Sequence, residues 1–110
     1  MKIPDDDNGK ILQGLIEHGD NLSRERNIEF FHIFSDRISA VKFALAVDEI
    51  EYTVSISYYE ERKMWDATVM CCMIPLHSEI NRIEESLGKQ AQENHGRSDG
   101  WQSQVILEKD

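Results

Sequence analysis

Apolar residues recur at helical spacing in three separate segments of the chain. The first segment carries a stripe of four such residues, Ile11, Leu12, Leu15 and Ile16. An acid run precedes this stripe and Gly19 follows it. Carboxylates at a helix start face the positive end of the helix dipole, and glycine often follows a helix end. The pattern predicts a helix over residues 6–18, and similar spacing predicts helices over 35–48 and 77–94.

Strand patterns separate these helices. Residues 28–34 are β-branched and aromatic, with apolar side chains in both alternation phases, which is typical of a central strand covered on both faces. Residues 50–59 alternate between apolar and polar, as in a half-exposed strand. Residues 65–73 have one apolar face and further apolar groups on the other. We expect a turn in 96–102, which reads GRSDGWQ, and a short last strand at 105–107.

The order of these elements is helix, then strand, helix, strand, strand, helix and strand. The last six match the ferredoxin-like split βαβ unit, so we predict an α+β sandwich with a four-stranded antiparallel sheet and an extra N-terminal helix. The first and third strands should lie in the middle, where both of their faces are covered. We expect the two later helices on one face and the first helix over part of the other. The chain should be one domain, 1–110, with a helical extension at 1–20 and a core at 28–107.

The balance of acidic and basic residues narrows the range of possible functions. The net charge is −9, from 21 acidic and 12 basic residues, which argues against direct nucleic-acid binding because phosphate affinity comes mainly from Lys and Arg. It suits a basic protein partner, and it is also what solubility alone would produce. The start, Met1–Asp7, has an acid run where a secretory signal has an apolar stretch, and no run approaches the roughly 20 apolar residues of a membrane span. We therefore expect a cytoplasmic protein.

The sequence offers little for catalysis. The cysteines, Cys71 and Cys72, are adjacent on a predicted strand and point to opposite faces, so we expect two reduced residues and no disulfide. No pair among the histidines, His18, His32, His77 and His95, has metal-ligand spacing. Nucleotide-binding glycine motifs and a nucleophile elbow are absent. We predict no enzyme activity, no cofactor and no metal.

Three further residue groups allow two interpretations each. The run Asp5, Asp6 and Asp7 could bind a hard cation, but helix capping explains it better. Aromatic residues on the first strand resemble those of RNA-recognition domains, which share this element order, yet the Lys/Arg-Gly signature is missing and the charge has the wrong sign. Trp101 follows Asp99-Gly100. It either covers the margin of the core, with its indole N–H on a backbone carbonyl, or anchors a partner from the surface.

Two stretches resemble the family called regulator of ribonuclease E activity B. Residues 4–34 are similar to its opening, which has an acid run, a short helix, Gly-Asp-x-Leu-Ser and an aromatic strand. The SDGWQS stretch, residues 98–103, resembles a Tyr-Asp-Gly-Trp-Gly-Thr motif near the end of such proteins, and departs from it at Ser98, Gln102 and Ser103.

The resemblance implies a ferredoxin-like fold and a protein that binds ribonuclease E at its non-catalytic scaffold half and inhibits it. The expected mechanism is occupancy, in which an acidic surface docks a basic segment of the nuclease without chemistry. We predict that the contact is made by Asp5, Asp6, Asp7, Asp99 and Trp101. The alternative is an acidic binding module for another basic protein, of the immunity or antitoxin kind. No membrane and no direct nucleic-acid contact are expected.

Overall fold

The sheet order follows the predicted topology. The computed structural model describes residues 3–48 and 52–107. Its elements are α1 (Asp7–Glu17), β1 (Arg26–Phe34), α2 (Arg37–Asp48), β2 (Thr53–Tyr59), β3 (Met64–Met73), α3 (His77–Glu93) and β4 (Gly96–Ser103). All strand pairs are antiparallel and the order is β2-β3-β1-β4. The first and third strands are therefore central, and the α+β fold predicted from the sequence is confirmed.

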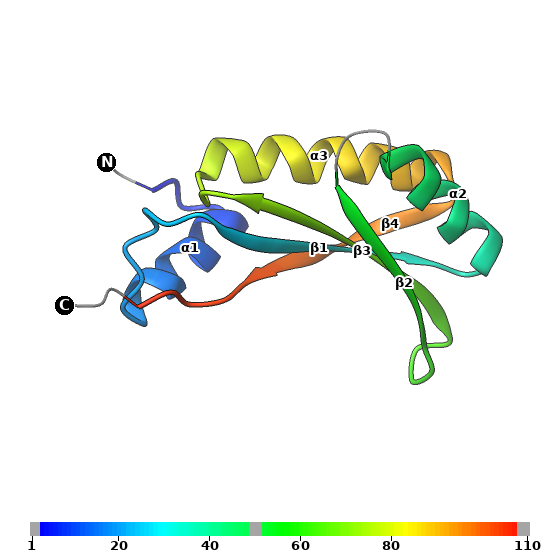
Figure 1. The fold of residues 1–110 in the computed structure, drawn as a ribbon, viewed down its shortest axis with the longest axis horizontal. Coiled ribbons are helices and arrows are strands. Elements are labelled where there is room, and N and C mark those ends of the chain that lie inside the picture. The colour runs from blue at the N-terminus through cyan, green and yellow to red at the C-terminus, as the bar shows by residue number, and fades with distance from the viewer. Residues whose placement is uncertain (1–2, 49–51, 108–110) are drawn as a thin grey trace.

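One face of the sheet carries the core. Alternate residues of β1 point to this face, and Ile28, Phe30 and Phe34 are each at most 1% exposed. Phe43 of α2 packs its ring 5.2 Å from the ring of Phe34, measured between centroids. Helix α3 contributes the stripe predicted from its spacing, with Ile80, Ile83, Leu87 and Ala91 all buried. Figure 1 shows α3 running along the sheet, with α2 at one end and α1 at the other.

Helix α1 lies on the same face as α2 and α3, so the expectation that it covers the opposite face was wrong. Its buried residues Leu12 and Leu15 belong to the same core cluster as Phe30 and Trp101. The physical reason is that α1 has a partner on that side, because Asn8 bonds to side chains of α3 and β4. The core cluster extends continuously from α2 to α1 along one side of the sheet.

The opposite face of the sheet, called the open face below, has no helix over it among the described residues. Glu29, Phe31 and Ile33 of β1 point to this face, and Glu29 lies across from Met70 of β3. Phe31 is half-buried, whereas Met70 is 36% exposed. Ile33 is 3% exposed, so the apolar residues on this face range from buried Ile33 to partly exposed Phe31 and Met70. Of the described helices, none is both long and apolar enough to cross a membrane.

The last strand is Gly96–Ser103, and the prediction of a strand at 105–107 was wrong. The Asp-Gly pair makes a bulge inside this strand instead of a turn before it. Gly100 has a φ of 94°, and the pairing with β1 shifts between Phe30 and His32. A glycine with positive φ is the usual device for adding one residue to a strand. The chain reverses earlier, directly after α3, where His95 takes a φ of 66°.

Candidate functional site

The predicted acidic contact begins at the N-terminus of α1. Asp6 is the helix cap, and its Oδ1 accepts a 2.7 Å hydrogen bond from the Gly9 N–H. The same carboxylate lies 2.8 Å from Nε2 of His77, the first residue of α3. The Gly9 N–H and then the His77 ring hold the pKa of Asp6 below its ordinary value of 3.8. Asp6 is thus engaged within the fold, as the capping interpretation predicted.

Asp5 and Asp7, on either side of the cap, are exposed. Neither forms a hydrogen bond or ion pair with another described residue. They project from a backbone that the Asp6 cap fixes, so two uncommitted carboxylates stand at a defined helix start. Exposed carboxylates of this kind steer and orient a cationic partner more than they stabilise the fold.

Trp101 lies in the core next to this helix start. Its side chain is 6% exposed, its ring centroid is 6.4 Å from that of Phe30, and its Nε1 donates a 2.7 Å hydrogen bond to Oδ1 of Asn8. Asn8 in turn donates 2.5 Å and 3.0 Å hydrogen bonds to Asn81 and Glu84 of α3. Trp101 is therefore buried, as expected of a residue that covers the margin of the core. The indole bonds to an amide side chain and not to the backbone carbonyl that we expected.

Asp99 lies on the open face, away from the α1 start. Its Oδ2 accepts a 2.7 Å hydrogen bond from Nη1 of Arg62, and the two side chains form an ion pair. Arg62 lies in the turn between β2 and β3. Both side chains are partly exposed, at 30% and 42%, so the pair adds little to stability. Beside it is a hollow of about 300 Å³ with Phe31 and Ile33 among its lining residues. Asp99 is therefore one wall of a shallow depression on the sheet.

Asp66 makes this depression electronegative. Burial first, and then the charges of Asp99 and Glu29, raise the pKa of its carboxyl above 3.8, while a hydrogen bond from Thr68 opposes the rise. Three carboxylates thus act on one another across the open face, and the charge of Arg62 partly offsets them. A second hollow of about 460 Å³ lies further along β1 and has Glu29 in its wall.

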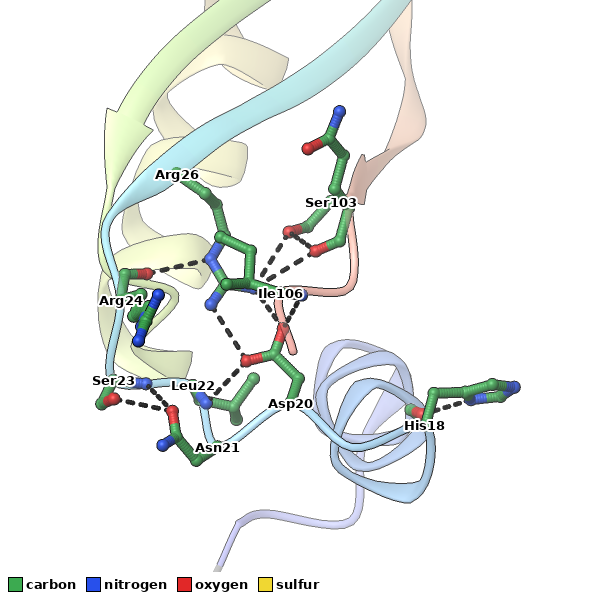
Figure 2. Close-up of polar contacts among 11 residues, drawn as sticks. His18, Asp20, Asn21, Leu22, Ser23, Arg24, Arg26, Ser103 and Ile106 are labelled. Carbon is green, nitrogen blue, oxygen red and sulfur yellow. Dashed lines mark hydrogen bonds and ion pairs between the residues drawn. The ribbon is translucent and has the colours of Figure 1, made fainter. Parts of the chain in front are cut away.

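A buried ion pair fixes the loop between α1 and β1. Asp20 and Arg26 are 2% and 5% exposed, and the guanidinium donates two hydrogen bonds of 2.5 and 3.0 Å to the carboxylate (Figure 2). Asp20 also accepts from the Leu22 and Ile106 N–H groups. The hydrogen bond from Arg26 is the main cause that lowers the pKa of Asp20 to about 2. The Gly-Asp-x-Leu-Ser stretch therefore has a structural role, because its Asp20 and the paired Arg26 attach the loop between α1 and β1 to the segment after β4.

The structure brings together only part of the predicted set. Asp5, Asp6 and Asp7 lie near Trp101 because Asn8 bridges α1 to β4. Asp99 belongs to the open face, because the Gly100 bulge separates it from the alternation that buries Trp101. Whether any of these residues binds a partner stays a prediction.

Sequence reasoning missed Asn8, Arg62, Asp66 and the Asp20–Arg26 pair. Asn8 directly follows the acid run and carries no charge that would mark it, and Asp20 and Arg26 lie between the first predicted helix and the first predicted strand, where no hydrophobic pattern assigns them a role. The one available signal for the ion pair was that Asp20 and Arg26, of opposite charge, are only six positions apart beside a short predicted helix. Arg62 meets Asp99 across 37 positions, which no local pattern indicates.

Catalytic and metal chemistry find little support in the described residues. No group of three or more His, Cys, Asp and Glu side chains among them is arranged to hold a metal ion. Both cysteines are free thiols, and burial raises the pKa of Cys71 to about 11. A hydrogen bond with Glu25 is the main cause that raises the pKa of Cys72. Both thiolates are thus disfavoured at neutral pH.

Comparison with protein families identifies the chain's relationship to a known family. The family model described as regulator of ribonuclease activity B matches residues 5–103. The match includes the α1 start, the Asp20–Arg26 ion pair, the open face and Trp101. No curated protein matches the chain.

Proposed function

Because the chain belongs to the regulator of ribonuclease activity B family, we propose that it binds ribonuclease E by protein–protein contact and restrains RNA decay without catalysing a reaction. The proposed target is the non-catalytic scaffold half of the nuclease. The site of action would be the cytoplasm, where RNA is degraded.

The observation that carries this proposal is the pair of uncommitted carboxylates at the α1 start. Asp5 and Asp7 are exposed and unpaired within the described residues, whereas Asp6 between them is used by the cap. A chain of net charge −9 attracts a basic segment over its whole surface, but fixed carboxylates give that attraction a place to dock. Occupancy of the scaffold would then limit its access to RNA or to other proteins.

The other predicted contact residues have different parts in this proposal. Asp99 would add a second acidic contact on the open face, where an arginine of the partner could replace Arg62 as its counterion. Trp101 would act indirectly, because it holds Asn8 and so the orientation of the α1 start. A truncation of Trp101 would therefore disturb both stability and binding.

The test is a direct titration of the purified scaffold half of ribonuclease E with the full chain, at low and moderate salt. The test variant is Asp5→Asn/Asp7→Asn, which leaves the Asp6 cap intact. The matched control is Glu60→Gln/Glu61→Gln, which removes the same charge from the exposed β2–β3 turn. We expect the test variant to bind about fivefold more weakly, a loss of about 1 kcal/mol, because exposed ion pairs each contribute up to about that amount.

The control should retain wild-type affinity at matched ionic strength. Equal weakening of both variants would leave only non-specific attraction by net charge and would refute the docking site. Absence of binding by the wild-type chain at both salt concentrations would refute the proposed partner. Binding of an unrelated basic protein with the same affinity would favour a general acidic binding module instead.

A further inference from the structure

The two edges of the sheet differ in how they are protected from pairing with another strand. Edge strands usually carry charges, prolines or bulges that discourage such pairing. Strand β4 has two of these devices, since it contains Arg97 and Asp99 and is bent by the bulge at Gly100. Strand β2 has none of them, because its sequence TVSISYY lacks charge, proline and glycine.

The outer edge of β2 is accessible. The strand pairs with β3 on one side, and within the described residues no other strand lies beside it (Figure 1). Helix α2 packs over it on the core face and leaves Tyr58 49% exposed there, and Tyr59, on the open face, is 47% exposed. A seven-residue strand with free backbone N–H and C=O groups is a template for strand addition.

The sequence of β2 complements itself when two copies run antiparallel about Ile56. On the core face, Val54 of one copy then lies opposite Tyr58 of the other, and the two Ile56 side chains meet. On the open face, Ser55 lies opposite Ser57 of the second copy. Pairs of aromatic with β-branched residues, and pairs of hydroxyl residues, are among those that stabilise antiparallel strands. Within Thr53–Tyr59, no like charges oppose each other in this register.

The distribution of charge favours a second copy over a basic partner at this edge. The chain carries 21 acidic residues, yet none falls within β2 itself or between Arg37 and Val47 of α2; the nearest described ones are Glu60 and Glu61, in the turn after the strand. A basic segment paired along β2 would meet no carboxylate within the strand, whereas the α1 start offers Asp5 and Asp7. Two acidic copies repel each other least where neither presents a carboxylate.

We infer that the chain forms a two-fold symmetric dimer in which the β2 strands pair antiparallel and join the two sheets into one of eight strands. Because the β4 edge is protected in each copy, the association closes at two chains. This dimer leaves the α1 start free and does not depend on the proposed nuclease partner.

The test is sedimentation equilibrium of the full chain over a concentration series. The wild-type chain should show a concentration-dependent species of twice the monomer mass and none larger. Ser55→Lys/Ser57→Lys places like charges opposite each other twice in the dimer, and should raise the dissociation constant roughly tenfold or more. The matched control Ser86→Lys/Gln92→Lys adds the same charge on the exposed side of α3 and should leave the dimer unchanged.

A charge-swap mixture makes the test independent of any loss of folding. Ser55→Glu/Ser57→Glu should also be monomeric alone, whereas an equal mixture of the lysine and glutamate variants should recover a dimer. A monomeric wild type, a dimer that survives the lysine variant, or a mixture that stays monomeric would each overturn the inference. Ile38 and Leu45 of α2 are apolar side chains that are 68% and 65% exposed. Loss of the dimer in Ile38→Ser/Leu45→Ser, with the lysine variant unaffected, would place the interface on these two residues and overturn the inference too.

Discussion

His32 should make the stability of this protein depend on pH between about 4 and 6.5. Its side chain lies on the core face of β1 and is 0% exposed, and its ring centroid is 4.7 Å from that of Phe43, with the two rings tilted by 44°. Its Nδ1 lies 3.3 Å from the Ala67 carbonyl oxygen, whereas its Nε2 has no partner among the described residues. Burial is the main cause that lowers the pKa of His32 from 6.5 to about 4, against weaker opposing effects of the Ala67 carbonyl and Asp99.

The size and sign of the effect follow from that shift. Between pH 6.5 and pH 4 the unfolded chain binds a proton at His32 that the folded chain excludes, so stability falls as the pH falls. A shift from 6.5 to about 4 corresponds to a loss of about 2 kcal/mol between pH 7.5 and pH 5, and of about 3 kcal/mol by pH 4. Asp20 does not contribute at pH 5, because its carboxyl is ionised there in both states. Asp66 acts in the opposite direction, since its folded-state pKa is raised.

The assay is urea unfolding of the wild type and of His32→Leu at pH 7.5 and pH 5. Leucine has a similar volume and does not titrate, and the difference between the two pH values is the quantity compared, so any fixed packing cost cancels. Effects of Asp66 and of other carboxyls are common to both proteins. We expect the wild type to lose about 2 kcal/mol more than the variant over this range. Equal losses in the two proteins would refute the assignment of the pH dependence to a buried neutral His32.

Three further substitutions test individual contacts by urea unfolding at neutral pH, and the first is also measured at pH 4 and pH 2. Asp20→Asn should lower the free energy of unfolding by about 3 kcal/mol, because it leaves the buried guanidinium of Arg26 without its carboxylate. The wild type should lose about 2 kcal/mol of unfolding free energy through Asp20 as the pH falls from 4 to 2, and the variant should not show this loss. Asn8→Ala should cost about 1–2 kcal/mol, since the buried indole N–H loses its acceptor. Gly96→Ala should cost at least about 2 kcal/mol, because a Cβ there would lie 2.3 Å from the Phe34 ring. An unchanged unfolding midpoint in any variant would contradict the contact concerned.

The fold could be predicted from the sequence because hydrophobic spacing and strand position agree. Apolar residues in both phases of residues 28–34 and 65–73 indicated central strands, and the clean alternation of β2 indicated an edge. The last strand was misplaced because Asp-Gly has two uses. It starts tight turns, and it also forms bulges inside strands, and only the pairing with β1 distinguishes these.

The candidate site was less predictable, because its geometry depends on contacts between distant residues. Capping by Asp6 follows from the local sequence, and the core position of Trp101 was one of two interpretations left open. The hydrogen bond from Trp101 to Asn8 spans 93 positions, so no spacing rule indicates it. The bulge at Gly100 changes the face that Asp99 occupies, and this single backbone feature separates two residues that the sequence places side by side.

The most direct test of the central claim is the initial rate of RNA cleavage by ribonuclease E as the full chain is added. The same titration on the isolated catalytic half of the nuclease is the comparison. We predict that the chain slows cleavage by the full-length nuclease and leaves the catalytic half unaffected, and that Asp5→Asn/Asp7→Asn requires about fivefold more protein for the same effect. An unchanged cleavage rate at saturating concentrations of the chain would contradict regulation by occupancy of the scaffold.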